Sequence, residues 1–346
     1  MNKRMIVALS CLVLSGACDS GPAVSDGPDE RFFLQSDGAL MPVRVRGNIE
    51  SGHFLIFLHG GPGDTIVNAR DFADAAYTPI ESDVAVVYWD QRCAGISQGA
   101  CDPQELSLES YTRDLDRLVA VLEHRYGADI DLSILSHSFG SWIAAYYLSE
   151  NNRDDRFEKW INVDGSYSAP LIFSLAQDMI LAAAERQIAY GNEVAGWEAL
   201  RLAVGSADLS TLQGRHTVNM GGATAADLMT RVDSVHTPRT VIGASAALGL
   251  SNELVTTIFN NVVTESAPFN TEIFSLDHTS RLAEIDLPVL LIWGKYDFTV
   301  PPAVADDFVR HVGSTQVQTL IMPHSEHTPM TSEPEAFGAA VTDFLR

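Results

Sequence analysis

One short stretch, residues 132–142, constrains the fold of this chain more than any other. An apolar run leads there into a cluster of small residues, and a segment with helical character follows. This order predicts a buried strand, a sharp turn and a helix, with Ser138 at the apex of the turn. Turns of this kind have the pattern G-x-S-x-G, in which Ser136 here replaces the first glycine and Gly140 keeps the second. We therefore interpret Ser138 as a nucleophile, although a serine that only caps the helix would leave a similar pattern.

Outside this stretch, apolar runs alternate with segments of helical spacing, such as residues 108–126. Uninterrupted apolar runs are typical of strands that are buried on both faces. They occupy residues 54–58, 84–89, 132–135, 160–164, 288–293 and 317–322. Residues 31–35 and 42–46 could form an antiparallel pair before them. Strands that alternate with helices favour an α/β fold with a mostly parallel sheet.

The alternation stops between residues 165 and 278, where Ala and Leu dominate and no strand run occurs. Helices are predicted at residues 171–190, 193–203, 225–232 and 252–261. We expect this region to be a helical cap inserted into the α/β core. The predicted organisation is a core in two parts, residues 31–164 and 281–346, with the cap at residues 165–280 between them.

A serine becomes a useful nucleophile only beside a base that a third group orients, and the later strands supply both. Asp297 follows the apolar run at residues 288–293, and His327 follows the run at residues 317–322. The carboxyl ends of parallel strands meet at one edge of a sheet, where such folds build their active sites. The sequence therefore predicts a catalytic triad of Ser138, His327 and Asp297.

Each of these assignments has an alternative. Asp164 also ends a predicted strand, and Asp297 could simply begin a turn before two prolines. His324 lies in the same loop as His327. We prefer His327 because the Thr328-Pro329 pair that follows it can begin the closing helix, which leaves the imidazole on the preceding loop.

Acyl transfer also needs two backbone N–H groups that bind the developing oxyanion. The residue after the nucleophile, Phe139, would supply one of them. The other is expected from the glycine-rich loop at residues 59–63, whose glycines let the backbone turn its amides toward the site. We choose Gly61, with Gly60 as the alternative.

The N-terminus resembles a bacterial lipoprotein signal. A short basic start precedes an apolar stretch at residues 5–14 that is too short to span a bilayer, and three small residues then lead to Cys18. We predict that residues 1–17 are removed and that Cys18 is lipidated. The alternative is a plain secretory signal that is cleaved near Ala17. Residues 18–30, rich in Gly, Pro and Asp, are expected to be a flexible tether.

Charge and cysteine content fit an exported protein. The chain has 45 acidic and 22 basic residues, a formal net charge of −23, so we exclude nucleic acid and anionic lipid headgroups as partners. The lipid at Cys18 would be its membrane contact. Cys93 and Cys101 lie eight positions apart in one loop, and an oxidising compartment would permit a disulfide between them. No spacing of Cys or His indicates a metal site.

Four motifs resemble the proline iminopeptidase branch of the α/β-hydrolase fold. They are His-Gly-Gly-Pro-Gly at residues 59–63, Asp-Gln-Arg-Cys-Ala-Gly-Ile-Ser at 90–97, Ser-His-Ser-Phe-Gly-Ser at 136–141 and Gly-Lys-Tyr-Asp at 294–297. The resemblance covers about residues 32–164 and 285–346. It implies a serine exopeptidase that removes an N-terminal residue, often proline, and needs no metal or organic cofactor. It supports Ser138, Asp297 and His327 as the triad.

The sequence departs from that family at four positions. Cys93, Ser136 and Glu326 stand where the family usually has Gly, and Phe139 stands where it has Trp. Such enzymes hold the free amino group of the substrate with acidic side chains of the cap. The candidates for this role are Glu198, which follows Trp197, and Glu185 and Glu272.

We therefore expect an exported serine hydrolase of the bacterial periplasm or cell envelope that acts on short peptides or amino-acid amides through an acyl-enzyme. A carboxylesterase or lactonase for small hydrophobic esters is the alternative, because the same machinery serves both reactions. A binding lipoprotein that keeps the fold without catalysis is disfavoured, since no triad member and no oxyanion glycine is missing.

Overall fold

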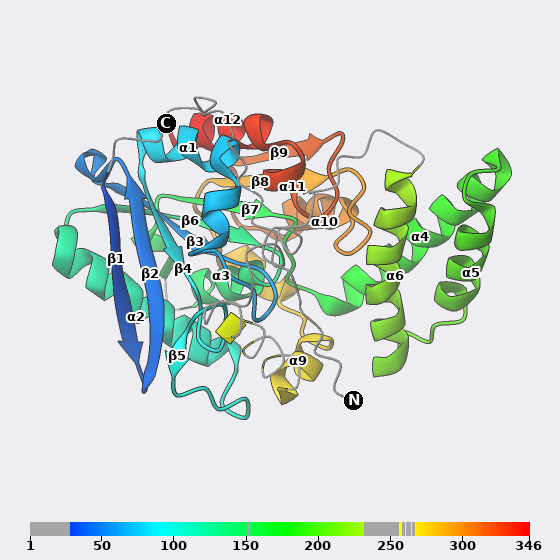
Figure 1. Ribbon diagram of the computed structural model, residues 1–346, viewed down its shortest axis with the longest axis horizontal. Coiled ribbons are helices and arrows are strands. Elements are labelled where there is room, and N and C mark those ends of the chain that lie inside the picture. Colours follow the sequence, from blue (N-terminus) through cyan, green and yellow to red (C-terminus); the bar gives the residue numbers. More distant parts are fainter. Residues whose placement is uncertain (1–27, 151–152, 232–255, 258–259, 261–263, 265–266) are drawn as a thin grey trace, which may run out of the picture.

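The computed structural model describes residues 28–150, 153–231, 256–257, 260, 264 and 267–346 (Figure 1). The strands are β1 (Asp29–Ser36), β2 (Ala39–Gly47), β3 (His53–Leu58), β4 (Ala85–Trp89), β5 (Gln98–Gly99), β6 (Asp131–His137), β7 (Lys159–Val163), β8 (Val289–Gly294) and β9 (Val317–Met322). They form one sheet in the order β1-β2-β4-β3-β6-β7-β8-β9, with β5 paired to β2. The β1–β2 and β2–β4 pairs are antiparallel, and every pair from β4 to β9 is parallel. The predicted mostly parallel sheet is confirmed.

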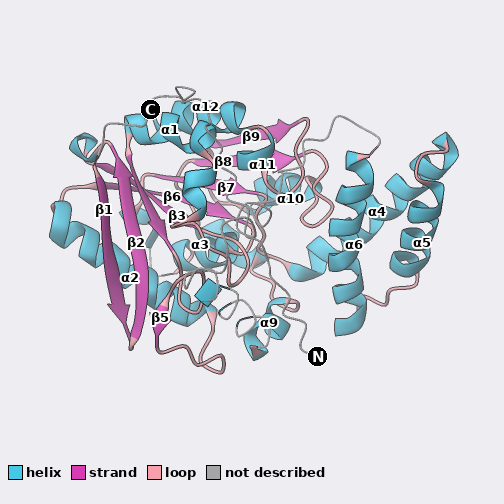
Figure 2. Ribbon diagram, in the orientation of Figure 1, coloured by secondary structure: helices cyan, strands magenta, loops and turns pink. Residues whose placement is uncertain are grey.

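Helices cover both faces of this sheet (Figure 2). The α-helices are α1 (Asp74–Asp83), α2 (Leu108–Tyr126), α3 (Gly140–Leu148), α4 (Ala169–Tyr190), α5 (Val194–Gly205), α6 (Leu212–Thr230), α9 (Pro268–Ile273), α10 (Ala303–His311), α11 (Pro329–Ser332) and α12 (Pro334–Leu345). Short 3-10 helices are η1 (Ile49–Ser51), η2 (Ala69–Phe72), η3 (Arg153–Arg156) and η4 (Thr279–Glu284).

Each face of the sheet has its own apolar core. On one face, Leu118 of α2, Ile143 of α3 and Phe308 of α10 are fully buried. On the other face, Tyr77 of α1 meets Phe337 of α12 edge-on, with ring centroids 6.4 Å apart. Burial of one such side chain stabilises the fold by about 1.5–3 kcal/mol. The two cores together fix the strand ends from which the functional loops leave.

The helices α4, α5 and α6 pack against one another beside this core (Figure 2). The sequence predicted only the end of α6, within residues 225–232. The helix begins at Leu212, where the Thr211 side chain accepts a hydrogen bond from the Gly214 N–H at 3.0 Å. Glycines lower the helix propensity of its first half. A Cβ at Gly222 would lie only 2.7 Å from the Phe298 carbonyl oxygen, so glycine lets α6 approach the core.

Several predictions lie at the edge of the described residues or beyond it. The predicted signal segment, residues 1–17, and Cys18 lie outside them, as does most of the predicted helix at residues 252–261. β1 begins at Asp29, inside the predicted tether, because the Asp29 carboxylate pairs with Arg44 of β2 at 2.7 Å. Within the described part of the chain, no helix is both long enough and apolar enough to cross a membrane. The domain boundaries at residues 165 and 280 stay a prediction.

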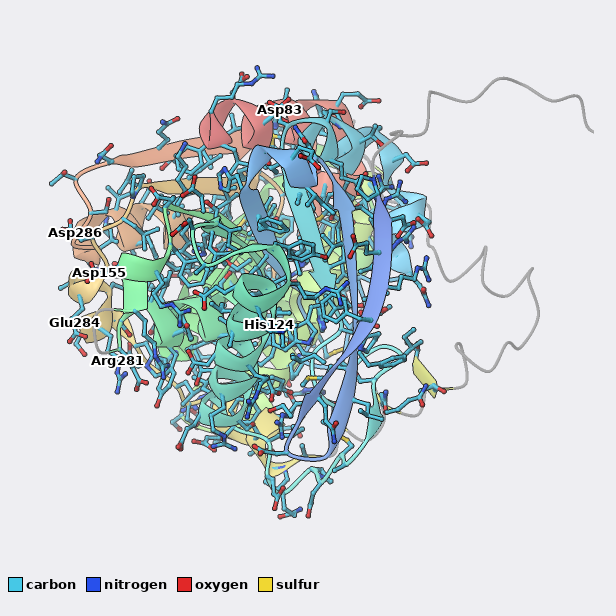
Figure 3. The ribbon with its side chains drawn as sticks, turned by 90° about the vertical axis from the view of Figure 1, so that its left-hand side faces the viewer. Asp83, His124, Asp155, Arg281, Glu284 and Asp286 are labelled. Carbon is cyan, nitrogen blue, oxygen red and sulfur yellow. A yellow bond between two sulfur atoms is a disulfide. The ribbon has the colours of Figure 1, made fainter. Side chains whose placement is uncertain are left out.

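Acidic side chains of the α/β domain lie on the outer surface of the molecule (Figure 3). Asp155, Glu284 and Asp286 are exposed there. These groups are solvated, and their negative charge serves solubility.

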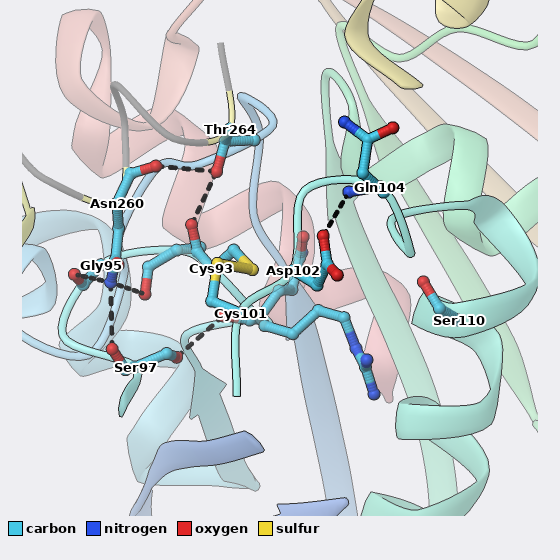
Figure 4. The surroundings of a disulfide bond; sticks show 12 residues. Cys93, Gly95, Ser97, Cys101, Asp102, Gln104, Ser110, Asn260 and Thr264 are labelled. Carbon is cyan, nitrogen blue, oxygen red and sulfur yellow. Dashed lines mark hydrogen bonds between the residues drawn. A yellow bond between two sulfur atoms is a disulfide. The ribbon is translucent and has the colours of Figure 1, made fainter. Parts of the chain in front are cut away.

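A disulfide joins Cys93 to Cys101 in the loop that follows β4 (Figure 4). Two polar side chains from the region before α9 bind the same loop. Asn260 donates to the Gly95 and Ser97 carbonyl oxygens at 3.0 Å each, and Thr264 donates to the Cys93 carbonyl oxygen at 2.7 Å. Both side chains are buried, so these bonds tie the disulfide loop to the segment that precedes α9.

Candidate active site

Ser138 lies between β6 and α3 in a strained backbone conformation. Its φ is +50°, in the left-handed region that residues other than glycine rarely adopt. The Ser138 N–H donates to the Val163 carbonyl oxygen of β7 at 3.1 Å, which holds the turn. A Cβ at Gly140 would collide with the Leu58 carbonyl oxygen of β3, so the second glycine of the motif is needed for α3 to pass β3. The predicted strand, sharp turn and helix are present.

Ser136, at the first glycine position of the motif, belongs to a buried hydrogen-bond chain. Its hydroxyl accepts a hydrogen bond from the Trp160 indole N–H at 2.8 Å and lies 2.9 Å from the Ser141 hydroxyl. Ser141 in turn donates to Asn162 Oδ1 at 2.8 Å. Ser136 is fully buried, and its hydroxyl would be costly to bury without these partners. Ser136 can thus replace the glycine because its buried hydroxyl has hydrogen-bond partners.

Ser138, His327 and Asp297 are joined by hydrogen bonds. His327 Nε2 lies 2.9 Å from Ser138 Oγ, and His327 Nδ1 lies 2.7 Å from Asp297 Oδ2. The other oxygen, Asp297 Oδ1, accepts from the Thr299 and Val300 amides at 2.8 Å each. Since Asp297 accepts the Nδ1 proton, neutral His327 presents the lone pair of Nε2 to the serine hydroxyl. The distance between Nε2 and Oγ suits proton transfer from serine to histidine, and the bond to Asp297 orients the ring.

The pKa of His327 lies above its usual value. Burial opposes the charged imidazolium, but the Asp297 carboxylate outweighs burial through its charge and its hydrogen bond, and Glu326 and Asp64 add to the effect. The pKa of the neighbouring His137 is shifted in the opposite direction. Burial, and then the charge of His327, lower the pKa of His137 to about 4. Neutral His137 lies with Nε2 2.8 Å from the His327 carbonyl oxygen and holds that backbone in place.

The glycine-rich loop after β3 lies against the nucleophile. A Cβ at Gly60 would be only 3.2 Å from the Cβ of Ser138. The Gln91 N–H donates to His59 Nε2 at 3.1 Å, so His59 carries its proton on Nδ1 and donates it to the Gly60 carbonyl oxygen at 2.8 Å. The amide of Gly61 belongs to the same trans peptide and points to the opposite side. This arrangement favours the Gly61 N–H, rather than that of Gly60, as the donor that acts with Phe139.

The alternative base and the predicted cap acids lie elsewhere. His324 is exposed, and its backbone N–H donates to the Glu333 carboxylate at 2.8 Å. The three cap acids lie on exposed helix surfaces: Glu185 on α4, Glu198 on α5 and Glu272 on α9. Trp197 is fully buried among the cap helices. The three predicted cap acids are thus exposed to solvent, and no hydrogen bond or ion pair joins them to the triad among the described residues.

Two other carboxylates act on the triad histidine, and the sequence analysis did not assign them to the site. Glu326 is partly buried beside His327, and burial raises its pKa, with the Asp297 and Asp227 charges adding to the effect while His327 opposes it. Asp64, in the glycine-rich loop, is exposed. Neither forms an ion pair with another described residue. The replacement of a family glycine by Glu326, next to the predicted base, was the available signal.

Residues 55–340 match the model of the alpha/beta hydrolase family. The chain belongs to the alpha/beta hydrolase family. Its fold, the order of its strands and the resemblance noted in the sequence agree with this membership.

This alpha/beta hydrolase has relatives with different named activities. The probable aminopeptidase YbaC of Bacillus subtilis (strain 168) is 21% identical over 88% of this chain and 92% of its own length. The proline iminopeptidase-related protein of Thermus thermophilus superposes with a TM-score of 0.59 at 22% identity, over 92% of this chain and 97% of that chain. A pimeloyl-acyl-carrier-protein methyl ester esterase of Yersinia enterocolitica is 40% identical over 70 residues, which are 20% of this chain and 26% of the esterase. The structural likeness shows the shared fold.

The raised pKa of His327 predicts the acid limb of the pH profile. Because the base acts in its neutral form, kcat/KM should fall as the pH drops, with a midpoint above the usual imidazole value of about 6.5. Asp297→Asn removes the carboxylate that stabilises the imidazolium and should move this midpoint to lower pH. Asp155→Asn, on the exposed surface, should leave it unchanged. A midpoint in Asp297→Asn that equals or exceeds that of the wild type would contradict the assignment.

Proposed function

We propose that this protein is a serine hydrolase that removes the N-terminal residue from short peptides or amino-acid amides. The hydrogen-bonded Ser138, His327 and Asp297 support the serine hydrolase chemistry. The preference for a free amino group rests on one observation: the carboxylates of Glu326 and Asp64 lie near His327, and neither has a cationic partner among the described residues. A substrate ammonium group would supply that partner. The similarity to the probable aminopeptidase YbaC supports the same substrate class.

In the proposed mechanism, His327 takes the proton of Ser138 while the serine Oγ attacks the scissile carbonyl carbon. The amides of Gly61 and Phe139 donate to the oxyanion of the tetrahedral intermediate. His327 then gives its proton to the leaving amine, and an acyl-enzyme remains on Ser138. Water, deprotonated by His327, hydrolyses this ester and restores the serine. Asp297 orients His327 and stabilises its charged form throughout. The proposed reaction uses no metal or organic cofactor.

Hydrolysis of small hydrophobic esters is the second candidate. An aromatic cluster beside the oxyanion loop favours it: Phe139 meets Tyr111 of α2 and Phe269 of α9, with centroid distances of 5.4 and 6.1 Å. All three side chains are buried, so an acyl group bound beside Phe139 would have apolar surroundings. The partial similarity to a methyl ester esterase points in the same direction.

The serine hydrolase proposal predicts that Ser138 is the reactive serine. Ser138→Ala should lose at least about 10⁴-fold in kcat, as in other triads, because the hydroxyl that carries the acyl group is gone. A fluorophosphonate probe should label the wild type and fail to label Ser138→Ala, while thermal unfolding shows that both are folded. Ser141→Ala is the matched control and should still be labelled. Labelling that persists in Ser138→Ala would reject this nucleophile, and a wild type that resists labelling would favour the non-catalytic binding lipoprotein.

The substrate proposal predicts that a free amine matters more than the type of scissile bond. Proline 4-nitroanilide should be cleaved much faster than its N-acetyl form and faster than 4-nitrophenyl butyrate. Glu326→Gln should lower kcat/KM for the free amine by about 10- to 100-fold, the value of a hydrogen bond to a charged group. The assay is made at a pH where His327 is neutral.

Glu198→Gln is the matched control for this experiment, since Glu198 is exposed on the cap, and it should behave as the wild type. An equal loss on acetylated and free substrates in Glu326→Gln would mean that Glu326 acts on His327 rather than on the amine. Equal rates on both substrates in the wild type, with faster butyrate turnover, would establish the esterase alternative.

We also propose that the chain is exported from a bacterial cell and anchored in the cell envelope through lipidated Cys18. The basic start, the short apolar stretch and the small residues before Cys18 support this. The paired Cys93 and Cys101 suit an oxidising compartment. Cys18→Ser should release soluble protein, because two or three acyl chains are needed for stable anchoring. Soluble wild-type protein with an unmodified N-terminus other than Cys18 would disprove the anchor.

A further inference from the structure

Asp164 is a buried carboxyl group next to the triad, and the proposed mechanism does not use it. It follows β7, the strand next to β8, and it is 0% exposed. Its φ is +44°, in the left-handed region, so its backbone is held in a strained conformation. One carboxyl oxygen, Oδ1, accepts a hydrogen bond from the Gly294 N–H at 2.8 Å. The other, Oδ2, is buried and accepts from no N–H or O–H donor among the described residues, and the side chain that the carboxyl does meet is Asp297. A polar atom left in that state calls for an explanation.

The carboxyl of Asp164 faces the histidines of the site. A carboxyl oxygen of Asp164, a ring nitrogen of His137 and a ring nitrogen of His327 all lie within 4.8 Å of one another. Asp297 contacts the same imidazole from the end of the neighbouring strand. The carboxyl ends of β7 and β8 therefore each bring one carboxyl group to His327.

Two adjacent buried carboxyl groups cannot both be ionised without a large cost. Asp297 accepts three hydrogen bonds, two from backbone amides and one from His327, whereas Asp164 accepts one from the described residues. The negative charge is therefore held by Asp297 and the proton by Asp164. The pKa values agree with this division: burial and then the Asp297 charge raise the pKa of Asp164 well above its usual value, and the Gly294 amide only partly offsets them.

We propose that Asp164 is a second positioning acid for His327, which is protonated while Asp297 carries the charge and ionises to replace it when Asp297 is neutral or absent. The titratable groups that face Asp164 are Asp297 after β8, Glu326 and His327 after β9, and His137 of β6. Loss of the Asp297 charge removes the largest effect, after burial, that keeps Asp164 protonated. The site then keeps one negative charge near the imidazole, but without the hydrogen bond that the Asp297 carboxylate makes to Nδ1, so the pKa of His327 still falls in Asp297→Asn. The inference rests on the proposed triad.

The test is a double-mutant cycle with Asp164→Asn and Asp297→Asn, assayed on proline 4-nitroanilide or the ester that the wild type prefers. Asp164→Asn replaces a neutral acid by a neutral amide, so alone it should lower kcat by less than about tenfold. The Asp297→Asn variant should retain part of the wild-type kcat. The double mutant should have a kcat that is lower than that of Asp297→Asn by a factor of about 10 or more. A loss from Asp164→Asn that is the same in both backgrounds would overturn the proposal, because a purely structural residue acts equally in each.

The pH dependence of kcat tests the proposal in a second way, because a residue with a purely structural role would not change the shape of the profile. In Asp297→Asn, kcat should rise with pH as Asp164 ionises, and this rise should be missing from the double mutant. Identical profile shapes in the single and double mutants would also overturn the inference. Asp164→Ser, which keeps a polar group but cannot ionise, should repeat the result of Asp164→Asn if the asparagine variant does not fold.

Ser138→Ala in the wild-type background separates this inference from the proposed function. If Ser138→Ala keeps its activity, the triad itself is wrong. If Ser138→Ala is inactive and the effect of Asp164→Asn does not depend on Asp297, only the second acid is wrong. Fluorophosphonate titration of active sites and thermal unfolding of each variant show that the rates refer to folded protein.

Discussion

The charge on the buried Asp297 carboxylate is the interaction on which the rest of the site depends. Asp297 is 1% exposed, and a charge buried at that depth is costly unless hydrogen-bond donors stabilise it. The Thr299 and Val300 amides donate to one oxygen, which leaves the other for His327. The imidazole is thereby fixed in one tautomer, with its free nitrogen toward Ser138. The strand that ends before Asp297 and the loop that follows it must both keep their positions for this to hold.

The loop motif at residues 90–97 supports the site through hydrogen bonds that hold neighbouring backbone in place, and it takes no part in the proposed reaction. The fully buried Asp90 carboxyl group accepts hydrogen bonds, at 2.8–3.0 Å, from backbone amides of the loop after β3 and of its own loop after β4. These amides belong to Ile66, Val67 and Ile96. Gln91 holds His59, which in turn orients the Gly60–Gly61 peptide. The loop after β4 thus sets the geometry of the loop after β3, which gives the motif at residues 90–97 a role although it contains no member of the triad.

The core of the site could be predicted from the sequence because it depends on local patterns. Apolar runs marked the parallel strands, and the residues at their carboxyl ends meet wherever such strands pair. The residues that face a substrate could not be predicted in this way, because they depend on how loops and cap helices pack. The three predicted cap acids lie exposed, while Glu326 lies beside His327. The first part of α6 could not be predicted for the same reason, because Gly222 is explained only by how closely α6 packs against Phe298.

The carboxylates near His327 link substrate charge to the state of the base. Together with the larger effect of Asp297, the Glu326 and Asp64 charges raise the pKa of His327 in the free protein and so favour the protonated imidazole. A cationic amine bound beside them would cancel much of their field and lower that pKa again. Binding of a substrate with a free amino group would therefore favour the neutral form of His327 that deprotonates Ser138, and binding of a neutral ester would not. The acid limb of kcat should then lie below that of kcat/KM for amine substrates, whereas the two should coincide for esters.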